Sequence, residues 1–115
     1  MSDVADLVGC FVVEVGVRQA WPFLTFCDNG PTPSVERRLY IESWIEVVPA
    51  TDIVPSDSLR TQWQALYVLN GLTVESIGVR GDSDLHIGFT TGEKLTVGGE
   101  QGPDASQPPW WIGSA

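Results

Sequence analysis

The sequence predicts a mainly β domain of the α+β class, with two related antiparallel β-meander units in one domain and a single covering helix. The first observation is an internal repeat, because residues 7–26 align with residues 69–89. The identical positions are Leu7, Gly9, Val12, Gly16, Val17 and Arg18 in the first copy and Leu69, Gly71, Val74, Gly78, Val79 and Arg80 in the second. The second is that apolar residues recur at helical spacing in one segment, between the two copies.

The correspondence continues beyond these identities, first after a slip of one residue and then across loops of different length. The aligned pairs are Leu24 and Phe26 with Ile87 and Phe89, Leu39 and Ile41 with Leu95 and Val97, and Trp44-Ile45 with Trp111-Ile112. Halves of about fifty residues would each be marginal alone, so we expect both to share one core. We therefore predict a single domain of residues 1–115, with repeat units at 7–48 and 69–113 joined by a linker and helix over 49–68.

The first copy predicts a helical turn followed by three strands. The turn covers 2–6, and the strands cover 8–17, 23–26 and 38–48, with a turn at 28–31. In the first strand, one face is expected to carry Phe11, Val13, Val15 and Val17. The third strand alternates, with Leu39, Ile41, Ser43, Ile45 and Val47 on one side and Tyr40, Glu42, Trp44 and Glu46 on the other. Gly16 and its counterpart Gly78 indicate a bulge or a close backbone contact.

The second copy follows a linker and a helix. The linker covers 49–55, and the helix begins after the capping residues Ser56-Asp57 and runs to about Leu69. Its apolar stripe consists of Leu59, Trp63, Leu66 and Tyr67. Strands are then expected over 73–80, 85–89 and 94–97, with a loop over 98–109 and a short strand or anchored tail over 110–112.

The charge balance restricts the class of partner. The 115 residues include fifteen Asp plus Glu and six Lys plus Arg, which gives a net charge of −9. Phosphates of nucleic acid and of anionic membranes would repel such a chain, whereas a basic protein would attract it. The alternative is that the acidity only keeps a small protein soluble.

The cysteines and the N-terminal residues indicate neither a disulfide framework nor export. Cys10 and Cys27 have no metal-ligand spacing, and Cys10 aligns with Leu72, so we expect it to be a buried hydrophobe. No signal peptide or transmembrane helix is recognisable, which makes the cytoplasm the expected compartment.

No arrangement of residues predicts an enzyme or a bound cofactor. Asp82, Asp84 and His86 could bind a divalent cation, but a β-turn explains the two aspartates and His86 alternates away from the apolar face. The sequence has a single histidine and no nucleophile elbow or phosphate-binding glycine loop. Arg18 and Arg80 could contact a ligand, but each more simply ends a strand with its stem packed over the sheet edge.

Aromatic and acidic residues predict a protein-binding surface instead. Tyr40, Glu42 and Glu46 combine aromatic anchors with charges that would steer a basic partner. Trp44 could belong to this face, but the recurrence of Trp-Ile favours a place in the core. Trp110 has no counterpart in the first copy and is the better candidate for an exposed anchor. The predicted partner-binding residues are Tyr40, Glu42, Glu46, Asp82, Asp84, Glu100, Asp104 and Trp110.

Residues 65–112 resemble a family of small uncharacterised bacterial domains. The motif consists of Leu-x-Gly-x-Thr-Val at 69–74, Leu-x-Ile-x-Phe-x-x-Gly-x-x-Leu-x-Val at 85–97, and the closing Trp-Ile at 111–112. Relatives of this type occur beside polymorphic toxins, where small acidic proteins serve as immunity factors. The resemblance implies the same role here and supplies no catalytic residues.

The leading hypothesis is therefore a cytoplasmic immunity protein, monomeric or weakly dimeric and without enzymatic activity. It would bind and neutralise a cognate toxin domain that is basic and of the nuclease type. One alternative is a structural module that assembles with itself through β edges. Another is a small-molecule or carbohydrate binder that uses exposed tryptophans.

Overall fold

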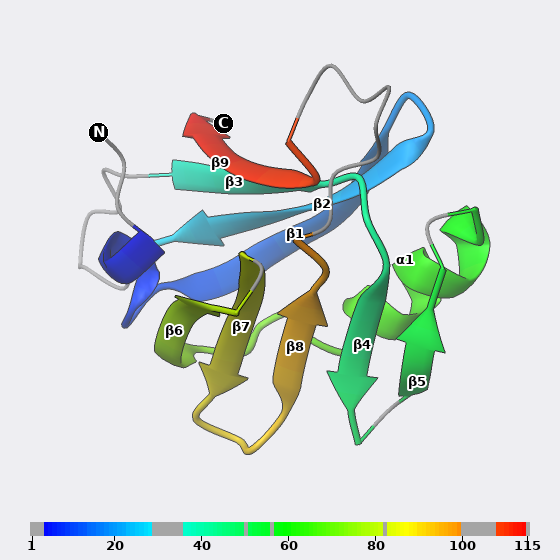
Figure 1. Cartoon of the computed structure of the whole chain (residues 1–115). Helices are drawn as coiled ribbons and strands as arrows, with labels where there is room; N and C mark the ends of the chain where they lie inside the picture. The colour runs from blue at the N-terminus through cyan, green and yellow to red at the C-terminus, as the bar shows by residue number, and fades with distance from the viewer. Residues whose placement is uncertain are drawn as a thin grey trace.

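Two antiparallel sheets and one α-helix make up the described part of the chain, which confirms the predicted mainly β class (Figure 1). A computed structural model describes residues 4–28, 36–49, 51–55, 57–81, 83–99 and 108–114. The elements are η1 (Val4–Leu7), β1 (Phe11–Arg18), β2 (Trp21–Cys27), β3 (Glu36–Ile41), β4 (Ile45–Val48), β5 (Thr51–Val54), α1 (Leu59–Tyr67), β6 (Val74–Arg80), β7 (Asp84–Phe89), β8 (Lys94–Val97) and β9 (Trp110–Ser114). No helix within these ranges is both long and apolar enough to cross a membrane.

Each sheet combines a three-stranded meander from one copy with a fourth strand from the other. The first sheet has the order β1-β2-β3-β9, and the second has the order β5-β4-β8-β7-β6. The strand β4 follows β3 in sequence but pairs with β8, whereas β9 follows β8 and pairs with β3. The two copies therefore exchange their fourth strands, and β5 extends the second sheet beyond the exchanged β4.

The two sheets meet at a corner where the copies pair reciprocally. The backbone bonds there run from Gly9 N to Val74 O (2.9 Å), from Gly71 N to Val12 O (2.7 Å), from Val12 N to Leu72 O (3.0 Å) and from Val74 N to Cys10 O (2.8 Å). The first two bonds correspond to each other when the two copies are exchanged, and so do the last two. This is the pattern that an approximate two-fold axis between the copies produces. Gly9 and Gly71 have φ values of +89° and +87°, a region that favours glycine and explains why both copies carry one.

The helices also cross from one copy to the other. The short η1 precedes β1 but packs against β6, and α1 precedes β6 but packs against β1, β2, β4 and β5. The Trp63 indole N–H donates to Val15 O on the edge of β1 at 3.2 Å. Gln62 is fully buried and its amide donates to Ser43 O (2.8 Å) and Val54 O (3.3 Å). These bonds fasten α1 across the open side between the sheets, where a single helix was predicted.

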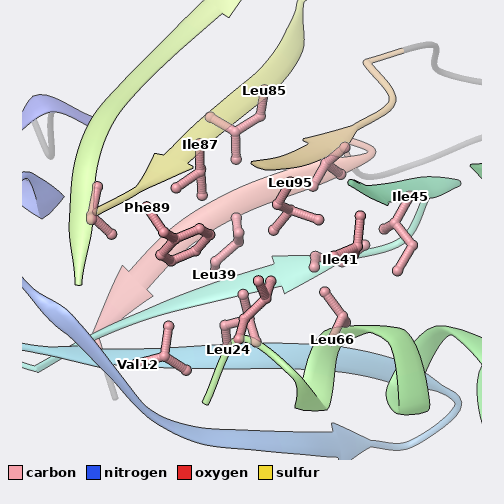
Figure 2. Packing of buried hydrophobic residues seen from close by; sticks show 14 of the residues in the cluster. Val12, Leu24, Leu39, Ile41, Ile45, Leu66, Leu85, Ile87, Phe89 and Leu95 are labelled. Carbon is pink, nitrogen blue, oxygen red and sulfur yellow. The ribbon is translucent and has the colours of Figure 1, made fainter. Parts of the chain in front are cut away.

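The core lies between the sheets and under α1 (Figure 2). Leu24 and Leu39 of the first sheet face Ile87 and Leu95 of the second, and Leu66 enters from α1. These apolar side chains stand at alternate positions of their strands, so one face of each sheet is buried.

Repeat-related residues occupy the same environment in both sheets. Val12 pairs with Phe26 and Val74 pairs with Phe89, and all four side chains are at most 2% exposed. A β-bulge follows each valine at the same position. The bulge turns Val12 and Val15 toward the core, so the predicted common face of Phe11, Val13, Val15 and Val17 is wrong.

Three other expectations about the elements are corrected by the structure. The strand predicted over 38–48 is two strands in different sheets, because the chain bends at 42–44. The predicted linker over 49–55 contains the edge strand β5. The helix is shorter than expected and begins at Leu59, where Ser58 is the N-cap residue but makes no side-chain capping bond.

Candidate interaction face

The outer face of the first sheet carries a row of aromatic rings that faces away from the core. Phe23, Tyr40 and Trp111 lie directly opposite one another on β2, β3 and β9. The Phe23 and Tyr40 ring centroids are 6.3 Å apart, and the Tyr40 and Trp111 rings stack at 5.1 Å with planes inclined by 20°. On β1 the row ends at Gly16, whose missing side chain leaves space for the Phe23 ring. We call these three side chains the aromatic row.

Two guanidinium groups lie on the aromatic row. The Arg38 guanidinium carbon is 4.3 Å from the Phe23 centroid, and that of Arg18 is 5.8 Å from the Tyr40 centroid. Arg38 is also held from the side, because its Nε donates to Thr25 Oγ1 at 3.1 Å and its Nη2 lies 3.5 Å from Glu14 Oε1. Such cation–π contacts fix the rings and partly desolvate the cations. The aromatic row is therefore ordered before any ligand arrives.

A hollow of about 170 Å³ opens at the end of the row where β1 turns into β2. It is lined by Arg18, Gln19, Trp21, Pro22, Tyr40, Glu42 and Trp111. The aromatic rings in the hollow offer apolar contact area. The Arg18 guanidinium, the Gln19 amide and the Glu42 carboxylate offer directional polar contacts. This combination suits a polar ligand with one apolar face, such as a protein side chain or a sugar ring.

The second sheet has no counterpart of the aromatic row at the equivalent positions. The strand pairing places Gly78, His86, Thr96 and Glu46 where the first sheet has Gly16, Phe23, Tyr40 and Trp111. The two copies thus share their core and backbone pairing but differ on their outer faces.

The predicted partner-binding residues do not all lie on one surface. Tyr40 belongs to the aromatic row, and Glu42 follows β3 at the rim of the same hollow. Glu46 lies on the outer face of the second sheet, because the chain bends between β3 and β4. Asp84 begins β7 in the second sheet, where its Oδ1 accepts a hydrogen bond from Gly99 N at 2.7 Å. The remaining three, Asp82, Glu100 and Asp104, lie outside the described residues.

Two tryptophans, Trp44 and Trp110, are both half-buried, which matches neither the core place expected for Trp44 nor the exposed anchor expected for Trp110. Trp110 is half-buried and packs against the core, and its indole N–H donates to Ser83 O at 2.9 Å, so it is not an exposed anchor. Trp44 is half-buried outside the core cluster, with its indole over Gly98. The cause is the register of the exchanged strands. Ile41 and Val97 are repeat-related, and they pair with Trp110 and Ile45 respectively, so Trp110 occupies the place of Ile45. Trp44-Ile45 and Trp111-Ile112 are therefore not equivalent.

Most residues of this surface were not among the predicted ones, including all its aromatic residues except Tyr40, namely Trp21, Phe23 and Trp111. A signal for Trp111 was present in the sequence. Ile112 is an inward position of β9, and a strand period of two then places Trp110 inward and Trp111 outward. Phe23 gave no such signal, because β2 is apolar at almost every position and both of its faces are largely buried.

The two cysteines of the chain are both buried and free. Burial raises the pKa of the Cys10 thiol, and burial together with the neighbouring Asp28 carboxylate raises the pKa of the Cys27 thiol. Both thiols are therefore less nucleophilic than an ordinary cysteine at neutral pH. Within the described ranges, no cluster of three or more His, Cys, Asp or Glu residues is arranged to bind a metal ion.

Comparison with known proteins identifies no relative, because no family model, curated protein or solved structure matches this chain. The resemblance to bacterial immunity proteins stays a prediction. The functional argument therefore depends on the composition and geometry of the outer faces.

Proposed function

We propose that this protein binds a basic protein partner through the aromatic row and the adjoining hollow, and that it neutralises the partner as an immunity protein does. The observation that carries the proposal is the aromatic row itself, an ordered aromatic surface on the first sheet whose equivalent positions on the second sheet hold no aromatic ring of Phe, Tyr or Trp. Tyrosine and tryptophan are the side chains most enriched among the energetically dominant residues of protein interfaces.

The packing of the row supports a role as an anchor. Phe23 is 7% exposed and forms a base, while Tyr40 and Trp111 are half-buried and keep part of their rings accessible. Rings that are already stacked lose little side-chain entropy on binding, so more of the contact energy remains as affinity. Tyr40 and Trp111 are therefore the expected centre of the interface.

The charge distribution supports a basic partner. The net charge of −9 would accelerate encounter with a positively charged protein. At the surface itself, the Arg38 charge is balanced by Glu14, and Glu42 at the hollow offers a carboxylate to an incoming lysine or arginine. We expect a one-to-one complex whose association rate falls as salt concentration rises.

The first partner to test is the basic domain that the proposal expects a neighbouring open reading frame to encode. Binding kinetics would be measured for Tyr40→Ala and Trp111→Ala beside the matched controls Thr96→Ala and Glu46→Ala, which alter the equivalent positions of the other sheet. The row variants should weaken binding about tenfold or more and abolish growth protection in co-expression, and the controls should do neither. Equal effects of row and control variants would contradict the proposed surface.

A carbohydrate ligand is the second candidate, and the hollow favours it specifically. Sugar rings stack their C–H faces on aromatic rings such as Trp21 and Trp111, and the polar groups of Arg18 and Glu42 could bind hydroxyls. Titration of tryptophan fluorescence with oligosaccharides would test this alternative. A saturable change that Trp111→Ala removes, without any protein partner, would favour it over the immunity role.

A further inference from the structure

A second hollow, of about 270 Å³, lies on the outer face of the second sheet and gathers basic and hydroxyl side chains. Its polar lining consists of Ser76, Arg80, His86, Lys94 and Thr96 from β6, β7 and β8. The chain has only six Lys plus Arg and one histidine, so two of those cations and the sole imidazole meet here. Such a concentration in a protein of net charge −9 requires an explanation.

The equivalent place on the first sheet shows how a cation is accommodated when no ligand is needed. Glu14, Thr25 and Arg38 lie opposite one another on β1, β2 and β3. The Thr25 hydroxyl donates to Glu14 Oε1 at 3.0 Å, and Arg38 Nη2 lies 3.5 Å from the same oxygen. The carboxylate of Glu14 therefore neutralises Arg38 within the sheet.

In the second sheet the cation is retained and the carboxylate is missing. The strand pairing places Ser76, Gly88 and Lys94 where the first sheet has Glu14, Thr25 and Arg38. Ser76 Oγ lies over Gly88, in space that a side chain there would need. Neither Lys94 nor Arg80 forms an ion pair with any described residue. The second sheet thus keeps the cation of this arrangement without the carboxylate.

The hollow also has room for an acceptor from outside. The Phe23 ring covers Gly16 in the first sheet, but no atom lies within 4 Å of the place where a Cβ on Gly78 would stand. His86, the counterpart of Phe23, lies instead toward Thr96, with its Nδ1 3.3 Å from Thr96 Oγ1. The second sheet has His86 and Thr96 at the positions that Phe23 and Tyr40 occupy in the first sheet. These smaller side chains leave the hollow open between Arg80 and Lys94.

We propose that this hollow binds the phosphate group of a small molecule, whose oxygens take the place that the Glu14 carboxylate fills in the other copy. The hollow gathers the donors of the Arg80 guanidinium, the Lys94 ammonium, two hydroxyls and the His86 imidazole. A phosphate has more acceptor oxygens than a carboxylate, and its tetrahedral shape can meet donors from several directions, so it suits this set of groups. Two acidic neighbours face this region. Asp84 lies directly opposite Arg80 in the strand pairing and accepts a hydrogen bond from Gly99 N at 2.7 Å. Glu46 lies opposite Thr96. Neither carboxylate forms an ion pair with Arg80 or Lys94, so both cations keep donors for a ligand.

The test uses inorganic phosphate and the full chain at pH 7.5, with chloride keeping ionic strength constant. The ring signals of His86, the single histidine, report binding by NMR without any activity assay. We expect a saturable shift that Lys94→Ala weakens about tenfold or more. Ser76→Glu, which restores the internal carboxylate, should weaken it at least as much. Arg18→Ala alters the equivalent of Arg80 on the other sheet and should leave the shift unchanged.

The outcomes separate a built site from general attraction of anions. Full phosphate affinity in Ser76→Glu or Lys94→Ala, checked as folded by circular dichroism, would overturn the proposal, as would the absence of saturation. Acetate that binds as tightly as phosphate would overturn the phosphate assignment. Tighter binding of adenosine monophosphate than of inorganic phosphate would support a phosphate ester as the natural ligand. Because the hollow and the aromatic row lie on different sheets and share no residue, failure of one proposal can be distinguished from failure of the other.

Discussion

Replacement of Gly16 by alanine tests whether the aromatic row depends on a missing side chain. A methyl group at Gly16 would stand 2.9 Å from Cε1 and Cε2 of Phe23 and nearer still to Cζ, whereas carbon atoms in contact are normally about 3.5–4.0 Å apart. The Phe23 ring cannot leave freely, because Arg38 lies on it at 4.3 Å and only 7% of the residue is exposed. Such overpacking costs about 1–3 kcal/mol. Removing a strand glycine returns about 0.5–1 kcal/mol, so the expected net loss is about 0–2.5 kcal/mol.

The same substitution at Gly78 is the matched control. Gly78 has the equivalent strand position, but an added Cβ would meet no atom within 4 Å. Gly78→Ala should therefore stabilise the protein by about 0.5–1 kcal/mol, and the two variants should differ by the overpacking cost alone, about 1–3 kcal/mol. Urea unfolding followed by tryptophan fluorescence would measure both, with a gap of roughly 4 °C in Tm per kcal/mol as a second readout. Variants of equal stability, within about 0.5 kcal/mol, would refute the proposed contact between Phe23 and the strand backbone.

Other predictions concern the helix, the last strand and the thiols. Gln62→Leu should destabilise the protein by about 1–2 kcal/mol in urea unfolding, because two buried carbonyls lose their donor, and an unchanged midpoint would contradict this. Trp110→Ala should lower the free energy of unfolding by about 2–4 kcal/mol, because this side chain packs on the core. Trp111→Ala should lower it by about 1 kcal/mol, because this ring only stacks on the outer face. Thermal melts in which Trp111→Ala is the less stable variant would disprove the assignment. The raised pKa values of Cys10 and Cys27 mean that the unfolded chain loses these protons first, so stability should hold up to about pH 8 and decline above it. Urea midpoints at successive pH values would check this, and a midpoint that rises between pH 8 and 10 would show the sign to be wrong.

The fold class could be predicted because its signals are local. β-branched runs, turn glycines and one helical stripe define most elements within a few residues, and the strand over 94–97 has the predicted bounds. The bend at 42–44 could not be predicted from alternation. Both sheets face the same core, so Ile41, Ser43 and Ile45 all remain buried while the chain passes from one sheet to the other. Unbroken alternation therefore concealed the boundary between two strands.

The interaction surface was harder to predict than the core. Tyr40 and Glu42 lie where the sequence placed them relative to each other, but Glu46 belongs to the other sheet. The grouping of side chains on an outer face depends on which distant strands pair and in what register, and a single sequence does not encode this in its local pattern. The aromatic row and the side chains that line the second hollow each come from three strands. They can therefore be recognised only once the strand pairing is known.

The exchange of β4 and β9 makes the two copies behave as an interlocked pair on one polypeptide. A fragment ending before α1 would contain β4 and β5 without β8, the strand that joins them to the second sheet, and its own meander would lack β9. We therefore expect such fragments to recover native structure only when mixed with their complement. Each sheet needs a strand from both copies, so the loss of either copy would leave both sheets incomplete. The outward side chains take no part in this exchange of strands and can therefore differ between the copies. One exterior could become aromatic and the other cationic while the shared interior stayed nearly the same.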